Sequence, residues 1–422
     1  MKNYVDVEER LPMLKTLPLS FQHLFAMVGA TILVPMLTNT NPSLALFCSG
    51  VGTILYIFCT KAKLPAYIGS SFAFIAPMLS ASAQYGRESM LSGIIAAGVI
   101  YVIVAAIIKF TGTKWLDKLL PPIVVGSVVI VIGLALAGVA INWSGLNPSF
   151  TTEAMAGVSR GAWILVALVT LGIGIFGSMY FKGFLGVIPI LMSMVVGYIL
   201  ALILGVIPEQ SLEMIKTAKL IQIPTFMAPK FNWNAILLMA PVAFVTLAEH
   251  IGHVYVTNNV CGRDFTKEPG LHRSILGDGV ATIFAGLVGG PPNTTYGENI
   301  GVMAITKVYS VWVIAWAGIV AIILSFIGPV SAIISNIPLP VMGGVSTLLF
   351  GIIASSGFRV FVENKIDFSM KKNLIICSVI IVLGIGGAVI QFKGIELSGV
   401  ALATVVGIIL NLVLPEKSKT EE

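Results

Sequence analysis

Long apolar stretches alternate with short polar connections along the whole chain. Charge-free runs extend from Thr16 to Thr60 and from Val308 to Phe358, and each is long enough for two membrane spans of about 20 residues. The pattern predicts an all-α polytopic membrane protein with fourteen transmembrane segments, at roughly 17–37, 42–60, 65–82, 91–110, 120–141, 161–181, 184–206, 234–257, 271–290, 293–308, 309–328, 335–357, 371–389 and 395–414.

Composition and charge support this class. The 422-residue chain is 57% apolar and only 10% charged, whereas about 25% charged residues is usual for a globular protein. Of its 25 lysines and arginines, six fall on one side, namely Arg87, Arg160, Lys216, Lys219, Lys230 and Lys393, and all others lie on the side of the termini. Because cationic connections remain cytoplasmic, we expect a multi-pass protein of the cell membrane with both termini in the cytoplasm. These connections explain the net charge of +6, so we predict no nucleic-acid partner.

Two stretches interrupt the apolar pattern at corresponding places in the two halves. They are PAYIGSSFAFIAP at 65–77 and PPNTTYGENIGVMAITK at 291–307. Prolines and glycines make a continuous helix unfavourable in both. Seven segments per half is an odd number, which gives inverted repeats, and paired interrupted segments mark the binding site of such transporters. The first repeat is predicted at 1–206 and the second at 234–414.

The interrupted stretches also predict local structure. The polar runs 66–72 and 293–297 are too short to span as strands, which need about 9–11 residues. If the two runs pair with each other, their backbone groups are satisfied at the membrane midplane. The short helices that follow begin near Phe72 and Glu298, and their unpaired N–H groups point at whatever binds there.

Three ionisable side chains in apolar surroundings are candidates for function. Glu298 lies in the second interrupted stretch, and Glu249 and His253 lie four residues apart on one face of the eighth segment. Ionisable groups inside a membrane are costly and usually functional. A carboxylate and an imidazole on one face form a candidate proton-coupling pair. A structural polar network remains the alternative, and His250, which points elsewhere, fits either interpretation.

Supporting roles are predicted for other polar side chains. We expect His23, Ser71, Asp278 and Asn299 to hydrogen-bond and support the broken segments without contacting the substrate directly. His250 and His253 lack a third ligand with metal spacing, so we predict no metal and no cofactor. The sequence presents no nucleophile–base pair, so an enzyme is disfavoured.

The donor and acceptor groups of the site indicate its ligand. Carboxylates accept hydrogen bonds from N–H groups, whereas the backbone N–H groups at Phe72 and Gly297 suit carbonyl oxygens. A small, flat, neutral ring with alternating N–H and C=O groups matches this set. Aromatic side chains at Phe72, Phe74 and Tyr296 are available to stack on it, whereas an anion is repelled by two glutamates.

The sequence resembles the nucleobase–ascorbate transporter family over nearly its whole length. The motifs are PLSFQHLFAMVGATILVP, KLPAYIGSSFAFIAP, AEHIGH, PGLHRS, PNTTYGENIGVMAITKVYS and IPLPVMGGVS. The family signature is an acid or glutamine followed by N-x-G-x-x-x-x-T-[R/K/G]. This chain meets it in full with Glu298, Asn299, Gly301, Thr306 and Lys307.

The resemblance implies a permease that imports uracil, or a related nucleobase, with a proton as the coupling ion. The implied fold has short antiparallel β strands in the broken third and tenth segments. It divides into a core domain (about 17–110 and 234–328) and a gate domain (about 120–206 and 335–414). Movement of the core against the gate gives alternating access, and the implied partners are membrane lipid and a second copy bound through the gate domains.

The resemblance also implies roles for the site residues. Glu249 and Glu298 bind the pyrimidine N–H groups, and His253 lies beside Glu249 at a substrate carbonyl. The backbone amides of Phe72 and Gly297 contact carbonyl oxygens.

Two further positions bear on the gate and the pocket. Tyr296 is implied to line the pocket. Phe350 stands where tyrosine is expected in close relatives, so a hydroxyl contact from the gate domain is not expected in this chain. A purine (xanthine or guanine) permease on the same scaffold remains an alternative, and an anion exchanger or channel of similar seven-plus-seven fold is a more distant one.

Overall fold

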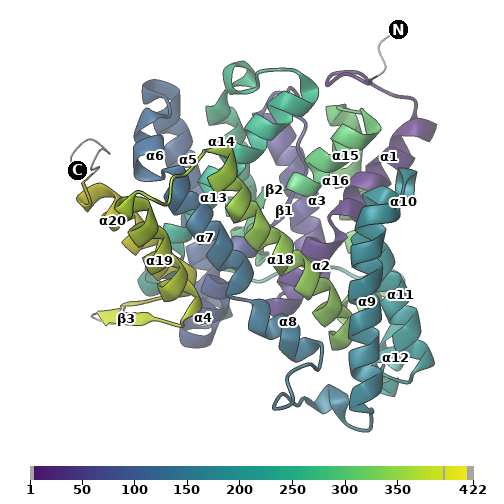
Figure 1. Ribbon diagram of the computed structural model, residues 1–422. Coiled ribbons are helices and arrows are strands. Elements are labelled where there is room, and N and C mark those ends of the chain that lie inside the picture. Colours follow the sequence, from purple (N-terminus) through teal and green to yellow (C-terminus); the bar gives the residue numbers. More distant parts are fainter. Residues whose placement is uncertain (1–3, 393–394, 416–422) are drawn as a thin grey trace.

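The computed structural model describes residues 4–392 and 395–415 and is mostly helical (Figure 1). Its first part contains α1 (Met13–Ala26), α2 (Val28–Leu37), α3 (Pro42–Cys59), β1 (Ile68–Ser70), η1 (Phe72–Phe74), α4 (Ile75–Tyr85), α5 (Arg87–Thr111), α6 (Lys114–Leu119), α7 (Pro122–Leu134), α8 (Ala137–Trp143), η2 (Glu153–Met155), α9 (Arg160–Tyr180), α10 (Gly183–Val187), α11 (Pro189–Ile203) and α12 (Glu209–Lys216). Its second part contains α13 (Trp233–Cys261), η3 (Thr266–Gly270), α14 (Leu271–Val288), β2 (Asn293–Thr295), α15 (Gly297–Thr306), α16 (Val311–Ser325), α17 (Gly328–Ser335), α18 (Leu339–Glu363), α19 (Lys371–Ile385), β3 (Val389–Phe392), β4 (Ile395–Ser398) and α20 (Gly399–Val413).

The helices identify an integral membrane protein. Among the described residues, six helical stretches are long and apolar enough to cross a membrane, and counting the bent pair α1–α2 as one span gives seven. Every predicted apolar segment contains a helix, but many of these helices are shorter than a span, so the count of fourteen stays a prediction. Four cations of the predicted charge distribution, Lys2, Lys393, Lys417 and Lys419, lie outside the described residues.

Several predicted segments are interrupted. The first bends by 40° at Met27, between α1 and α2, and the seventh restarts as α11 at Pro189. The predicted helix from 395 was wrong at its start, because residues 395–398 form β4, which pairs antiparallel with β3. Gly387 has a φ of +71° just after α19, a conformation that glycine adopts without strain.

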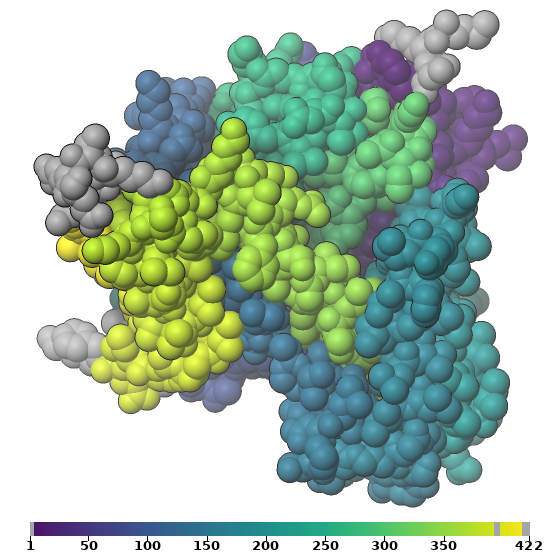
Figure 2. Space-filling view, in the orientation of Figure 1, coloured from purple at the N-terminus to yellow at the C-terminus, as the bar shows by residue number. Residues whose placement is uncertain are grey.

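Helix packing in one half is repeated in the other when segments are shifted by seven places. The α5–α14 contact has a counterpart in α3–α16, and α13–α5 has one in α1–α16. Likewise α9–α11 corresponds to α19–α20, and α18–α9 to α7–α19. Helix α18 contacts α7, α8 and α9 and runs diagonally across the face shown in Figure 2, between the yellow α19–α20 region and the blue-green α9–α11 region.

Glycines let the most extensively packed helices approach closely. A Cβ on Gly98 of α5 would lie 2.7 Å from the Gly279 carbonyl oxygen of α14. A Cβ on Gly50 of α3 would lie 2.5 Å from the Gly318 carbonyl oxygen of α16. Both contacts are with backbone, which cannot rotate away, so small residues are required at these two crossings.

Replacing Gly98 by alanine is expected to lower the free energy of unfolding by about 1–3 kcal/mol, because the added methyl separates α5 from α14. Gly172 in the interior of α9 is the matched control, since a Cβ there meets no atom within 4 Å. Alanine at Gly172 is expected to be neutral or to stabilise by up to about 1 kcal/mol through helix propensity. Thermal unfolding of the purified proteins in detergent measures both changes. Equal midpoints for the two variants would contradict the close helix approach.

The segment before α1 contacts the ends of both α13 and α15. These contacts were not predicted from the sequence. Val5 pairs as a parallel bridge with Val308, just after α15. The guanidinium of Arg263, beyond the end of α13, lies 2.8 Å from Asp6 Oδ1 and 2.7 Å from Glu8 Oε1. The two helices that carry the candidate glutamates are therefore held together at the same side of the molecule as the N-terminus.

Candidate functional site

The two interrupted stretches meet as a pair of short strands near the centre of the molecule (Figure 1). Strands β1 and β2 are antiparallel, with Ile68 opposite Thr295 and Ser70 opposite Asn293. The Ser49 hydroxyl of α3 donates to the Ile68 carbonyl oxygen at 2.7 Å, and the Ser71 N–H donates to the Pro292 carbonyl oxygen at 2.9 Å. The predicted pairing of the two polar runs is confirmed.

A buried side chain of α14 and a backbone carbonyl of α3 anchor β2. The Thr282 hydroxyl donates to the Asn293 carbonyl oxygen at 3.0 Å and lies 3.3 Å from the Asn293 backbone nitrogen. The Asn293 side chain donates to the Cys48 carbonyl oxygen at 3.2 Å. Since backbone polar groups at membrane depth must be paired within the protein, these contacts let a broken segment exist there.

Replacing Thr282 by valine keeps the side-chain shape and removes the hydroxyl from the Asn293 backbone. We expect the free energy of unfolding to fall by about 1–3 kcal/mol, the cost of leaving buried backbone polar groups without this partner. The control is Thr404→Val, because the Thr404 hydroxyl is also buried but bonds only the Val400 carbonyl of its own helix. Thermal unfolding of both purified variants measures the difference in stability. A Thr282→Val protein as stable as the Thr404→Val control would contradict this anchoring role.

Helix α15 starts immediately after β2 and exposes its first turn. It begins at Gly297, and no side chain caps its N-terminus, so the N–H groups of its first turn lack an intrahelical partner. Gly297 and Glu298 are exposed, whereas the next residue, Asn299, is buried. Gly301 and Ala304 continue the exposed stripe along the same helix.

Helix α13 brings His253 and Glu249 to this helix start. His253 Nδ1 lies 3.1 Å from Thr295 Oγ1 of β2, and a Cβ on Gly297 would lie 3.4 Å from His253 Nε2. Glu249, one turn earlier on α13, is half-buried. Helices α13 and α15 are in contact, so Glu249 and Glu298 lie on neighbouring helices. The structure therefore brings together both glutamates, His253 and the start of α15.

Exposed residues of α13 lead from the site toward the N-terminal segment. An exposed stripe of α13 runs from Gly252 through Tyr255 and Val256 to Asn259. It ends in an open hollow lined by Tyr255, Asn258, Asn259, Gly262, Arg263, Asp264 and Thr266. Glu298 lies on an exposed stripe of α15, and a carboxylate in a membrane segment is costly unless it faces water or a partner.

The predicted supporting residues lie around the strands. His23 Nδ1 of α1 is 2.7 Å from Asn299 Oδ1 of α15, so the first segment contacts the half-helix directly. The Ser71 hydroxyl and the Asn299 side-chain nitrogen are buried without a protein partner. Unpaired buried polar atoms next to an open site are a sign of ligand or water contacts.

Aromatic residues divide between the site and the apolar core. Tyr296 is buried, and its hydroxyl donates to the Ser70 carbonyl oxygen, so it braces β1 against β2; its contact with substrate stays a prediction. Phe72, at the start of η1, is partly buried and packs against the apolar clusters that contain Phe74, Phe350 and Tyr296. Phe350 of α18 is buried in the apolar cluster that includes Ile75 and Leu349.

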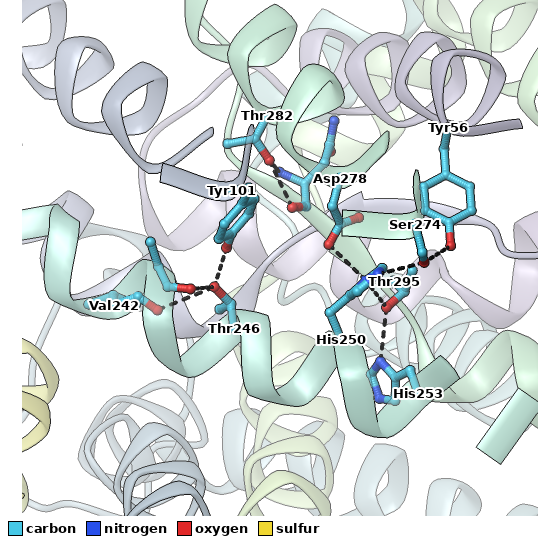
Figure 3. Close-up of polar contacts among 12 residues, drawn as sticks. Tyr56, Tyr101, Val242, Thr246, His250, His253, Ser274, Asp278, Thr282 and Thr295 are labelled. Carbon is cyan, nitrogen blue, oxygen red and sulfur yellow. Dashed lines mark hydrogen bonds and ion pairs between the residues drawn. The ribbon is translucent and has the colours of Figure 1, made fainter. Parts of the chain in front are cut away.

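A second polar cluster lies behind β2, and the sequence analysis largely missed it. His250 contacts Asp278, Ser274 and Thr295, as Figure 3 shows. Sequence reasoning left His250 without an assigned role and placed Asp278 only as a supporting residue. A histidine and an aspartate in apolar segments were the available signal, but their partnership depends on the packing of α13 against α14.

Comparison with known proteins identifies the family. The permease family model matches residues 14–392. The chain belongs to the permease family. It is the family of nucleobase–ascorbate transporters that the motifs indicated, so the protein is a membrane transporter.

Similar proteins cover nearly the whole chain. The uracil permease of Paenibacillus larvae subsp. larvae is 48% identical over 408 residues, which covers 97% of this chain and 96% of that protein. The uracil permease of Escherichia coli strain K12 is 49% identical over 409 residues, covering 97% of this chain and 93% of that protein.

Solved structures of transporters share the fold at low sequence identity. The transmembrane domain of the cyanobacterial bicarbonate transporter BicA has a TM-score of 0.64 at 14% identity and covers 96% of this chain and 100% of that one. The murine Slc26a9 anion transporter in the inward-facing state has a TM-score of 0.68 at 12% identity, covering 98% of this chain and 68% of that one. These likenesses show the fold and not the substrate.

Proposed function

We propose that this permease imports uracil into the cell together with a proton. The observation that carries the proposal is its 48–49% identity to uracil permeases over 97% of its length. The meeting of two carboxylates with the start of α15 adds chemical support, because uracil offers two N–H groups and two carbonyl oxygens. The anion transporters of similar fold weigh little here, since two glutamates disfavour an anionic substrate.

In this proposal the pyrimidine lies between the half-helix starts and α13. Glu298 and Glu249 each accept one N–H group of the ring, and His253 lies beside Glu249 at a carbonyl oxygen. The backbone N–H groups of Phe72 and Gly297 donate to the carbonyl oxygens. Tyr296 closes the pocket wall, while His23, Ser71, Asp278 and Asn299 hold these groups in position.

The proposed transport cycle moves a core domain (about 17–110 and 234–328) against a gate domain (about 120–206 and 335–414). Two inverted repeats, 1–206 and 234–414, are supported by the helix contacts that recur after a shift of seven segments. Phe72 lies where the proposed core and gate domains meet. Its short helix η1 contacts α7, and its side chain packs against the apolar cluster that contains Phe350 of α18. With both termini cytoplasmic, the open hollow at the end of α13 lies on the cytoplasmic side, which favours an inward-open state. In this proposal a homodimer forms through the gate domains.

Uptake of labelled uracil by proteoliposomes tests the proposal. An inward-directed proton gradient is expected to drive accumulation by about tenfold or more, and a protonophore is expected to abolish it. An excess of unlabelled xanthine or guanine is expected not to compete. Competition by those purines at equal concentration would favour the purine permease instead, and gradient-independent equilibration would contradict proton symport.

A further inference from the structure

Hydroxyl groups and imidazoles alternate in a continuous hydrogen-bonded chain behind β2 (Figure 3). Tyr56 Oη lies 2.6 Å from Ser274 Oγ, which lies 2.7 Å from His250 Nε2. On the other side of the ring, His250 Nδ1 lies 3.1 Å from Thr295 Oγ1, and Thr295 Oγ1 lies 3.1 Å from His253 Nδ1. The chain therefore reaches from deep in the protein to the imidazole at the candidate site.

His250 also forms a buried pair with Asp278. His250 Nδ1 lies 3.0 Å from Asp278 Oδ2, and the side chains are 1% and 3% exposed. Asp278 Oδ1 is buried without a protein partner. An ionised carboxylate is costly in such surroundings unless it is paired with a charge or protonated. The pair therefore gains stability when one proton is added to it.

One tautomer of His250 leaves room for an incoming proton. With its proton on Nε2, His250 donates to Ser274 Oγ, and the Ser274 hydroxyl donates to Tyr56 Oη. Nδ1 is then an unprotonated acceptor, to which the Thr295 hydroxyl donates. The bond at one ring nitrogen fixes the role of the other in this way. A proton on His253 Nδ1 donates to Thr295 Oγ1 from the other side.

Titratable groups approach the pair from several elements. Tyr56 comes from α3 and Tyr101 from α5, where the Tyr101 hydroxyl bonds Thr246. Glu249 and His253 come from α13 itself, and Glu298 comes from α15. Asp278 interacts electrostatically with both Tyr101 and Glu249. Of these groups, His253 is joined to the pair through the Thr295 hydroxyl and Tyr56 through the Ser274 hydroxyl.

We propose that the His250–Asp278 pair stores the coupling proton and that Thr295 passes it between this pair and His253. This inference rests on the proposed proton symport and names where the proton resides. When His253 is protonated at the site, its Nδ1 proton moves to Thr295 Oγ1, and the Thr295 hydroxyl proton moves to the unprotonated Nδ1 of His250. His250 is then an imidazolium, which donates from Nδ1 to Asp278 Oδ2 and from Nε2 to Ser274 Oγ. Each N–H or O–H bond that breaks is replaced, and the positive charge moves from His253 to His250, where the Asp278 carboxylate pairs with it.

The substitution Thr295→Val tests this relay directly, because valine keeps the shape of threonine and removes the hydroxyl group that passes the proton. The full-length protein is reconstituted in liposomes, and two rates are measured with labelled uracil. Counterflow at equal pH reports binding and domain movement, whereas accumulation under an imposed proton gradient also requires coupling. For Thr295→Val and Asp278→Asn we expect gradient-driven accumulation to fall about tenfold or more, with counterflow reduced less than about threefold.

Two further variants separate proton transfer from structural support. Thr295→Ser restores the hydroxyl and is expected to recover most of the gradient-driven accumulation. Tyr101→Phe removes a nearby hydroxyl outside the chain and is expected to leave both rates at the wild-type level. Equal loss of counterflow and accumulation in Thr295→Val, or no rescue by serine, would overturn the relay in favour of a structural role.

The outcomes also separate this inference from the proposed function. If wild-type protein exchanges uracil but ignores the proton gradient, proton symport fails and the relay fails with it. If wild-type protein responds to the gradient and Thr295→Val and Asp278→Asn respond equally, only the relay is overturned. Should Thr295→Val not fold, as judged by size-exclusion chromatography and thermal unfolding, Asp278→Asn decides by the same two rates.

Discussion

Glu298→Gln is expected to weaken uracil binding by about a hundredfold, because a hydrogen bond to a charged group contributes about 1.5–3 kcal/mol. Glu298 lies in the first turn of α15 and is exposed. A carboxylate only accepts hydrogen bonds, so both of its oxygens suit a ring N–H. A glutamine presents an NH₂ group at one of these positions, where it opposes the substrate donor.

Isothermal titration of the detergent-purified proteins with uracil measures this change. Glu213→Gln on α12 is the matched control, since Glu213 forms an exposed pair with Lys216 far along the chain from the site. We expect its affinity to stay within about twofold of wild type. A Glu298→Gln protein that binds as well as this control would remove Glu298 from the binding site.

Glu249→Gln is expected to weaken uracil binding by about tenfold to a hundredfold, through loss of the second charged acceptor. Glu249 is half-buried on α13, one turn before His253. Because α13 and α15 are in contact, removing one of their two carboxylates is also expected to relieve like-charge repulsion at the site, which offsets part of the loss. The effect is therefore expected to be no larger than that of Glu298→Gln.

Binding of labelled uracil to Glu249→Gln and Glu249→Asp separates the effect of side-chain charge from the effect of side-chain length. Aspartate keeps the charge on a shorter side chain. If the charge matters most, we expect Glu249→Asp to bind uracil more tightly than Glu249→Gln does. Thermal unfolding without ligand checks that both variants fold. Wild-type affinity in Glu249→Gln would show that the pyrimidine does not contact this carboxylate.

The broken segments and their pairing were predictable because their chemistry departs from the apolar background. Prolines and small polar residues at 65–77 and 291–307 cannot continue a membrane helix, and backbone groups at that depth need partners. Only another interrupted segment could supply them. The sequence therefore predicted the contact of β1 with β2, and it placed the start of α15 within one residue, at Gly297 instead of Glu298.

The network behind β2 was not predictable in the same way. Ser274 and Tyr56 are small or amphipathic residues in apolar helices, and such residues occur throughout membrane segments. Their meeting with His250 depends on how α3, α13 and α14 pack, which periodicity does not reveal. The same holds for the N-terminal segment, where the pairing of Val5 with Val308 joins residues far apart in the chain.

The β3–β4 hairpin shows a limit of hydropathy alone. Val389 and Ile390 extend the apolar pattern of the preceding segment, so hydropathy gave no reason to end the helix before them. The glycines at 386 and 387 end α19, and the β-branched residues that follow favour a strand. Local backbone preference therefore outweighed the apolar run.

The central claim, that two carboxylates each take one N–H group of a neutral pyrimidine, is tested most directly by N-methylated uracils. Binding of uracil, 1-methyluracil and 3-methyluracil to the wild-type protein is measured by titration under identical conditions. Each methyl group removes one donor, so each analogue is expected to bind at least about tenfold more weakly than uracil. Both analogues binding as tightly as uracil would contradict the account.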